Sequence, residues 1–321
     1  MSGERLRKAL LGLADATHGM PLAPRAAATY YYRGRIYLSG AQFEKAAADF
    51  AEAIRRKDDF ALAYANRGAA FQGQSLHGLA LADFRRFFGL VRSVYALHPE
   101  CVRIYSAQVH ILRAVSYKLL GELDRALEDL DTSVRFNPAV GLAWGERGIV
   151  HQGLRRPALA IRDMNKAVEL EPKNPGFLAG RGFAHFLDGA LDRAVADFSR
   201  AVSFGADLYA MLFLYLVRAR LGHEAATELA HNAASRPTTE WPQPAAAFLL
   251  GGNDADWLLN KANGAGEKAE ATFYIGQRHL LRGEASEAAR WLRRAAAECP
   301  PPFLERNIAI IDLEHLKGKT T

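Results

Sequence analysis

The fold is decided by residues 144–172, whose sequence reads WGERGIVHQGLRRPALAIRDMNKAVELEP. Gly148 is followed twelve positions later by another small residue, Ala160, and then by Ala167. Packed helices lie about 8–10 Å apart, so small residues are expected where their backbones approach most closely. Pro172 cannot continue a helix and would end the second one. The stretch therefore predicts a hairpin of two antiparallel helices.

The same pattern recurs along the chain. Gly34 and Gly68 are 34 residues apart, and so are Gly148 and Gly182. In each copy an Ala follows the Gly twelve residues later, and a large apolar residue comes four residues after that Ala. A single hairpin cannot bury its apolar face alone, so this period predicts an array of stacked hairpins. The small residue at the shared position marks six hairpins: Gly34, Gly68, Ala114, Gly148, Gly182 and Gly276.

These residues resemble the tetratricopeptide repeat (TPR), a helix-turn-helix motif of the same period. The resemblance covers roughly residues 27–205 and 269–302, and His151 stands where the family usually has Tyr. It implies an all-α solenoid of helix-turn-helix units that forms a right-handed superhelix, with a capping helix at each end. The turns inside the hairpins are expected at glycines, such as Gly121, Gly189 and Gly283.

The departures from the period divide the chain into four regions. We expect an N-terminal capping helix and linker over residues 1–25, and five TPR units over 26–205 with a helical extension at 95–106. Residues 206–268 read as a degenerate helical repeat and linker, and 269–321 as a final TPR unit with a C-terminal capping helix. The extension predicts two elongated helices, the later one beginning at Pro99. It is either a local change of shape or a docking element.

Two series of charged residues follow the repeat. An Arg precedes the small residue of each first helix, and an Asp precedes the large apolar residue of each second helix. We predict Arg–Asp pairs that link helices within or between repeats, because the two series recur together. The alternative is a row of arginines that binds anions. The residues are Arg33, Arg67, Arg113, Arg147 and Arg181, with Asp49, Asp83, Asp129, Asp163 and Asp197.

No pattern of catalytic or metal-binding residues is present. The two cysteines, Cys101 and Cys299, are far apart, and the sequence contains no HExxH, GxSxG or Gly-rich phosphate loop. Three of the ten histidines, His151, His185 and His279, share one packing position of the repeat. Residues at the same position of adjacent repeats lie about 10 Å apart, which is too far for them to bind one metal ion. We therefore expect no enzyme, no metal and no cofactor.

The expected function is a non-catalytic scaffold or adaptor that binds a protein or peptide ligand. In the TPR architecture the first helix of each hairpin lines a concave groove, which suits an extended peptide or a helix. Read from this sequence, the groove contains Tyr31, Arg35, Leu38, Ala65, Asn66, Gln72, Gln108, Ile111, Lys118, Ile149, Gln152, Phe183 and Phe186.

Two narrower alternatives remain. The C-terminal part, with Trp291 to Glu305, resembles short bacterial TPR lipoproteins of the NlpI type, which implies an envelope-associated adaptor for a protease or cell-wall hydrolase. The lipid-bearing cysteine of that group is missing from the start of this sequence. The net charge of +6 and the pI near 9.3 suggest a second alternative, a repeat protein that binds nucleic acid. The basic residues are interspersed with acids rather than clustered, which argues against it.

The sequence contains no apolar run of the roughly 18 residues that a membrane span needs. It also has no signal-peptide core in the first twenty residues. We therefore expect a cytoplasmic protein without a membrane span, or a periplasmic one if the true start lies upstream.

Overall fold

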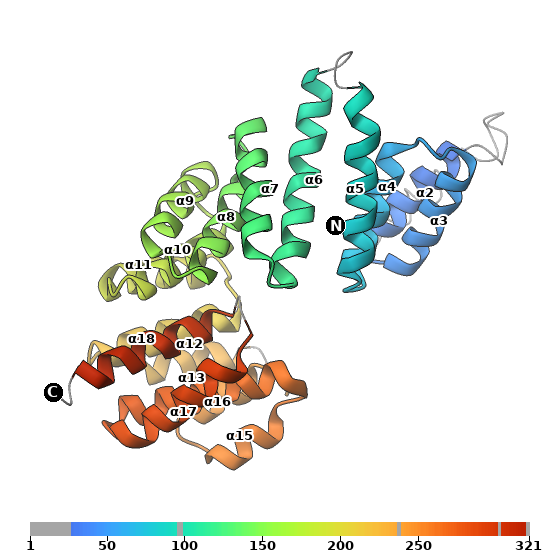
Figure 1. Cartoon of the computed structure of the whole chain (residues 1–321). Helices are drawn as coiled ribbons and strands as arrows, with labels where there is room; N and C mark the ends of the chain where they lie inside the picture. The colour runs from blue at the N-terminus through green and yellow to red at the C-terminus, as the bar shows by residue number, and fades with distance from the viewer. Residues whose placement is uncertain (1–26, 95–98, 236–238, 301–302, 319–321) are drawn as a thin grey trace. The chain divides into compact units, whose positions relative to one another are not determined.

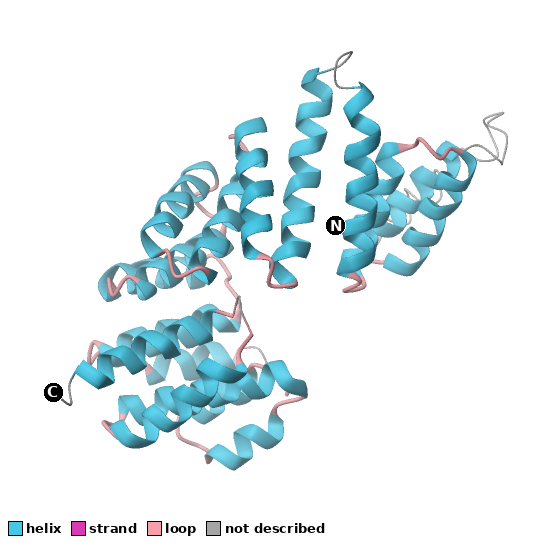
Figure 2. Ribbon diagram, viewed as in Figure 1, coloured by secondary structure: helices cyan, strands magenta, loops and turns pink. Residues whose placement is uncertain are grey.

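The computed structural model describes residues 27–94, 99–235, 239–300 and 303–318. Within these ranges every regular element is a helix, and they are labelled α2 to α18 (Figures 1 and 2). The all-helical TPR fold predicted from the sequence is therefore confirmed. The chain forms two compact units, residues 1–138 and 139–321. The predicted N-terminal capping helix lies outside the described residues.

Unit 1 contains three helical hairpins, and their order follows the chain. Each hairpin packs its first helix, A, against its second helix, B, and each A helix contacts the A helix of the next hairpin. Phe50, Phe84 and Phe87 on the B helices are fully buried and form the core between the helices. The pairs are α2 (Ala27–Ser39) with α3 (Phe43–Arg56), α4 (Ala61–Gly73) with α5 (His77–Val94), and α6 (Pro99–Leu119) with α7 (Leu123–Phe136).

Unit 2 begins with two regular hairpins and ends with an irregular helical region. The regular pairs are α8 (Gly141–Gly153) with α9 (Pro157–Leu170), and α10 (Pro175–Leu187) with α11 (Leu191–Ser203). They are followed by α12 (Leu208–Arg220), α13 (Ala226–Ala234), α14 (Gln243–Leu249) and α15 (Ala255–Lys261). The last hairpin is α16 (Gly264–Leu281) with α17 (Ala285–Glu298), and α18 (Leu304–Gly318) closes the described chain.

The glycines that mark the repeat lie at the predicted close contacts. A Cβ atom added to Gly34 would come within 2.8 Å of Phe50, and one added to Gly68 within 2.6 Å of Phe84. Real Cβ atoms essentially never come this close to another side chain. The partner stands sixteen residues after the glycine, on the B helix of the same hairpin. The same spacing joins Gly148 with Met164 at 3.0 Å, Gly182 with Phe198 at 3.0 Å, and Gly276 with Leu292 at 2.9 Å.

The turn inside each hairpin uses one residue in the left-handed region. Gly121, Gly189 and Gly283 have φ angles of 78°, 76° and 75°, as their predicted place in the turns requires. The equivalent residues of the other regular hairpins are not glycines. Ala41, Ser75 and Arg155 adopt φ angles of 54°, 60° and 55° there, a conformation that costs an L-residue roughly 1–2 kcal/mol.

All five predicted Arg–Asp pairs form, and each one joins the A and B helices of a single hairpin. In the fourth hairpin Arg147 donates through Nε to Asp163 at 2.6 Å and through Nη2 at 2.9 Å. The other four pairs have the same two-point geometry, with distances of 2.6 to 2.7 Å. The aspartates are buried in every case. These arginines are therefore occupied by structural pairing, and the anion-binding alternative is excluded for them.

Other expectations hold for individual elements. The elongated helices around residue 97 are present, since α5 runs to Val94 and α6 begins at Pro99. Helices α12 and α13 are joined by a turn at Gly222, and α15 is capped by Asp254. Helix α14 was not predicted. Its sequence is only seven residues long and follows a proline-rich stretch, so no helical period is visible in it.

Candidate peptide-binding surfaces

The predicted groove residues of unit 1 divide into buried and accessible positions. Tyr31, Ala65 and Ile111 occupy the same position of successive A helices, and all three are buried. Tyr31 packs against Phe60, with ring centroids 4.7 Å apart, so this position serves contact between hairpins. The groove residues that stay exposed are Arg35 and Gln108, and those that are half-buried are Leu38, Asn66, Gln72 and Lys118.

Two of the predicted groove amides already bind the protein itself. Gln72 on α4 donates through Nε2 to the Leu112 carbonyl oxygen at 2.5 Å and to Ser116 Oγ at 2.8 Å, both on α6. Asn66 donates through Nδ2 to the Leu62 carbonyl oxygen at 2.7 Å and to the Tyr31 hydroxyl at 3.3 Å. These amides fix the spacing of the A helices. Both bonds of Asn66 use its Nδ2, so its Oδ1 stays available, and Asn66 is counted with the other accessible residues in the A-helix surface of unit 1: Arg35, Leu38, Asn66, Gln108 and Lys118.

In unit 2 the C-terminal helix covers most of the corresponding face. Helix α18 contacts α8 and α10, the A helices of the fourth and fifth hairpins. Asn307 on α18 donates through Nδ2 to the backbone oxygens of Gln152 and Gly153 at 2.9 and 3.2 Å. Gln152 itself is 5% exposed, and its Nε2 donates to the Gly180 oxygen at 2.6 Å. The sequence predicted α18 as an end cap, but not that it folds back over these hairpins.

Ion pairs hold α18 in place. Arg220 on α12 forms a two-point pair with Asp312 on α18, at 2.8 and 2.6 Å. Gln277 on α16 also donates to Asp312, at 2.8 Å. The Arg220 guanidinium lies 4.7 Å from the ring centroid of Phe186, which is therefore enclosed. Of the predicted groove residues in unit 2, Gln152 and Phe186 are buried, whereas Ile149 and Phe183 remain half-buried.

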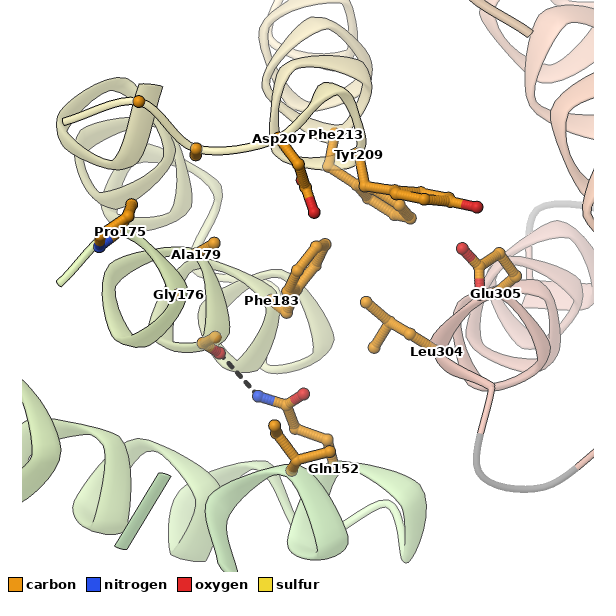
Figure 3. Close-up of a pocket in the computed structure, with 14 residues that line it drawn as sticks. Gln152, Pro175, Gly176, Ala179, Phe183, Asp207, Tyr209, Phe213, Leu304 and Glu305 are labelled. Carbon is orange, nitrogen blue, oxygen red and sulfur yellow. Dashed lines mark hydrogen bonds between the residues drawn. The ribbon is translucent and has the colours of Figure 1, made fainter. Parts of the chain in front are cut away.

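Ile149 and Phe183 line a cavity of about 490 Å³ inside unit 2 (Figure 3). Four helices supply its walls, namely α8, α10, α12 and α18, together with the turn before α12. The Phe183 ring lies edge-on to Phe213, with centroids 4.8 Å apart, and these rings form the apolar floor. The further lining residues are Gln152, Pro175, Gly176, Ala179, Gly180, Gly205, Ala206, Asp207, Tyr209, Leu304 and Glu305.

Two carboxylates face this cavity. Figure 3 shows the side chains of Asp207 and Glu305 directed toward its interior from different helices. Asp207 caps α12, since one of its oxygens accepts the Ala210 N–H at 3.1 Å. Glu305 is only 7% exposed, and burial together with the nearby Glu270 raises its pKa to about 8. A group that titrates near neutral pH in a cavity is a feature of functional sites.

Behind the cavity, a third carboxylate is satisfied by hydrogen bonds. Glu270 on α16 accepts from the Tyr209 hydroxyl at 3.1 Å and from Trp241 Nε1 at 2.7 Å. Burial raises its pKa, and the two hydrogen bonds act in the opposite direction. Glu270 is thus a structural acid that positions Tyr209 at the cavity wall.

Tyr209, Phe213, Leu304 and Glu305 are site residues that the sequence analysis missed. They come from α12 and α18, which lie outside the regular period, so no repeat position identified them. Glu305 stands among other charged and polar residues of α18, such as Arg306, Asn307 and Asp312, so the sequence alone gave no signal that set it apart.

The histidines and cysteines form no reactive centre in the described part of the chain. His110 Nδ1 lies 2.7 Å from Asp129, and His151 and His185 lie beside the aspartates of their own hairpins. Cys299 is buried, which raises the pKa of its thiol to about 12. No group of three His, Cys, Asp or Glu side chains suited to a metal ion occurs among the described residues. Nor does any described helix combine the length and apolar character needed to cross a bilayer.

Several known proteins are similar to this chain. Human tetratricopeptide repeat protein 13 is 26% identical over 172 residues, which is 54% of this chain and 19% of that protein. Human mitochondrial import receptor subunit TOM70 is 24% identical over 234 residues, or 72% and 37%. The chain therefore spans well under half the length of both. The lipoprotein NlpI homolog of Haemophilus influenzae is 25% identical over 225 residues, or 67% of this chain and 72% of that protein.

A solved structure also shares the fold. A tetratricopeptide repeat protein from Parabacteroides merdae superposes with a TM-score of 0.51, at 17% sequence identity, over 91% of this chain and 98% of that one. No family model matches the sequence. The repeated glycine contacts and the hairpins that carry them match the pattern of the tetratricopeptide repeat, and the chain is similar to proteins named for that repeat.

Proposed function

We propose that this protein is a non-catalytic scaffold that binds a peptide or helix of a protein partner through its A helices. The observation that carries the proposal is the A-helix surface of unit 1. Its five side chains remain accessible on α2, α4 and α6, which contact one another in sequence. The charged residues that recur with the repeat, by contrast, form ion pairs inside the hairpins, as Arg33 does with Asp49.

The chemistry of this surface suits an extended backbone. The Gln108 amide can donate and accept hydrogen bonds with peptide groups, Asn66 can accept one through Oδ1, and Leu38 offers an apolar contact. Arg35, whose guanidinium lies 5.9 Å from the Tyr31 ring centroid, and Lys118 add positive charge. Binding would therefore combine backbone hydrogen bonds with a small number of side-chain anchors.

Site-specific photo-crosslinking in the native organism tests the proposal. A photoreactive amino acid is placed at Gln108 or at Arg35, and, as a control, at Arg55 on the B helix α3, whose side chain is 69% exposed. We expect discrete adducts with partner proteins from the first two positions and none from the third. Adducts that form only from Arg55, or from no position, would contradict binding at the A-helix surface.

The similarity to the NlpI homolog favours a more specific second candidate. It covers about two thirds of each chain, which is more of the relative than either human match covers. The candidate is an adaptor at the cell envelope that presents substrates to a protease or organises a cell-wall hydrolase, as the sequence resemblance implied. If this candidate is correct, a protease added to cells whose outer membrane has been opened should digest the native protein. Complete protection, with a periplasmic control protein digested, would exclude it.

A further inference from the structure

The cavity of unit 2 combines apolar walls with two carboxyl groups. Its volume of about 490 Å³ lies within the usual range of ligand sites. Ile149, Phe183 and Leu304 provide apolar surface, while Asp207 and Glu305 provide two carboxyl groups. Among its described lining residues there is no lysine, arginine or histidine.

Glu305 is the unusual member of this set. Its side chain is more than nine-tenths buried and faces the cavity, yet no side chain of the described residues forms a hydrogen bond or ion pair with it. Its own backbone N–H, in the first turn of α18, is the donor that acts on the carboxyl group. Buried carboxylates are normally paired, because an unpaired one loses its hydration without compensation. Among the described residues the carboxyl group therefore lacks the side-chain partner that its buried position calls for.

The shape of the cavity restricts what that partner can be. Phe183 and Leu304 line the cavity together with Glu305, so a ligand that reaches the acid also contacts apolar side chains (Figure 3). Lysine and arginine side chains meet this requirement, since each carries a charged group at the end of an aliphatic stem. Tyr209 also lines the cavity, and an aromatic ring can add a favourable surface for a cation.

We propose that this cavity binds the side chain of a lysine or arginine presented by a partner peptide, with Glu305 as the counter-charge and Asp207 as a second acid in its lining. The inference rests on the proposed scaffold function and specifies one anchor of the partner. Glu270 takes no direct part, because Tyr209 and Trp241 already satisfy it.

The protonation of the empty cavity agrees with this assignment. Glu305 faces Glu270 and Tyr274 on α16, Tyr209 and Asp207 at α12, and Cys299 before α18, and none of these supplies positive charge. Its neighbour Arg306 donates instead to the Ala296 carbonyl oxygen, at 3.2 Å. With a pKa of about 8, the carboxyl group holds its proton at neutral pH until a cation arrives. Binding of a basic side chain would then release that proton.

Titration with matched peptides tests the proposal. The probes are capped tetrapeptides Gly-Leu-Lys-Gly, the same with arginine, and the same with norleucine, which keeps the aliphatic stem and removes the charge. Binding is followed by NMR of the Ile149 and Leu304 methyl groups in the full chain. We expect the basic peptides to bind at least about tenfold more tightly than the norleucine peptide. Equal affinities, tighter binding of an acidic analogue, or no saturable shift up to about 10 mM would overturn the proposal.

Variants separate charge from shape. Glu305→Gln should reduce the affinity for the lysine peptide to that for norleucine, whereas Glu314→Gln, exposed on the same helix, should leave it unchanged. Asp207→Asn retains the cap of α12 and should weaken lysine binding only a few-fold. Retained methyl dispersion shows that each variant is folded. Undiminished lysine binding to Glu305→Gln would overturn the assignment of the counter-charge.

The pH dependence supplies an independent readout. Lysine binding to the unmodified protein should tighten from pH 6 to pH 9, because binding needs the ionised carboxylate, and Glu305→Gln should show no such rise. A flat profile for the unmodified protein would contradict the proposal. If the peptides fail to bind but crosslinks still form from Gln108, the cavity is not an anchor and the proposed scaffold function stands. If no crosslinks form but the lysine peptide still binds more tightly than the norleucine peptide, the cavity is a binding site and the A-helix surface is not.

Discussion

Asn307 on α18 and Gln152 on α8 are joined by a hydrogen bond across 155 residues of chain, from Asn307 Nδ2 to the Gln152 carbonyl oxygen at 2.9 Å. The acceptor, like that of Gly153, belongs to the last turn of α8, where carbonyl groups have no partner within the helix. Asn307 is 2% exposed, so water does not take over this role. The C-terminal helix thus completes the end of a helix in the fourth hairpin.

Asn307→Ala should therefore destabilise unit 2. The carbonyl oxygen of Gly153 would lose the donor that Asn307 provides, and that of Gln152 would keep only backbone donors such as the Arg155 N–H, which typically costs about 1–3 kcal/mol in the free energy of unfolding. Urea denaturation followed by circular dichroism measures the loss. Asn260→Ala, at an exposed position of α15, serves as the control and should change stability by less than about 0.5 kcal/mol. Equal stability of the two variants would mean that the Asn307 contact contributes nothing.

The Arg–Asp pairs should differ in their contribution according to burial. The side chains of Arg147 and Asp163 are 11% and 0% exposed, whereas those of Arg33 and Asp49 are 47% and 9% exposed. Arg147→Met leaves a fully buried charge without its partner and should cost about 3–5 kcal/mol. Arg33→Met, at the equivalent position, should cost about 1 kcal/mol, because solvent screens the more exposed pair.

Amide hydrogen exchange measures both Arg variants hairpin by hairpin, which suits a repeat protein whose units need not unfold together. Protection should fall in α8 and α9 for Arg147→Met, and much less in α2 and α3 for Arg33→Met. Similar losses in the two hairpins would show that burial does not set the strength of these pairs.

Two glycine-to-alanine substitutions should distinguish the effect of close helix packing on stability from the effect of backbone flexibility. Gly68→Ala places a methyl group 2.6 Å from Phe84, so the hairpin must shift, at a cost of about 1–3 kcal/mol. Gly78→Ala lies at the start of α5 with no atom within 4 Å of the new Cβ, and it should stabilise by about 0.5–1 kcal/mol. Thermal unfolding distinguishes the two. A neutral Gly68→Ala would mean that the helices approach less closely there.

The raised pKa of Glu305 predicts how stability depends on pH. The pKa is about 8 in the folded protein and about 4.5 in the unfolded chain, so the folded state retains a proton that the unfolded state gives up. This contribution to stability is complete below pH 4.5 and is lost progressively as the pH rises through 8. Glu305→Gln should therefore be more stable than the unmodified protein at pH 8, by roughly 1–3 kcal/mol.

The difference between Glu305→Gln and the unmodified protein is the quantity to measure, because other groups titrate equally in both. Urea midpoints at pH 5 and pH 8 provide it. The difference should widen with pH in favour of the variant. A difference that stays constant would show that Glu305 ionises as freely as in the unfolded chain.

The hairpins and their ion pairs could be predicted from the sequence because both depend on contacts within one repeat. Gly148 and Met164, or Arg147 and Asp163, stand sixteen residues apart, and a recurring spacing reveals such contacts directly. The turn residues Gly121 and Gly189 followed from the same period.

The candidate site was predicted only in part, because half of its walls lie outside the period. Ile149 and Phe183 could be named from their repeat position, but Glu305 belongs to a helix whose place is fixed by Asn307, Asp312 and their distant partners. Each of these long-range contacts joins one particular pair of residues and does not recur with the repeat among the described residues. A single occurrence leaves no periodic trace in the sequence.

The spacing of sixteen residues between Arg147 and Asp163, and between Gly148 and Met164, has a consequence for how such a chain can grow. Both partners of each contact are encoded within one hairpin, so duplicating or deleting a whole 34-residue segment adds or removes them together. No buried aspartate is left without its arginine, and no aromatic ring without its glycine. The length of the array can therefore change by gene rearrangement while every remaining hairpin keeps a complete set of internal contacts.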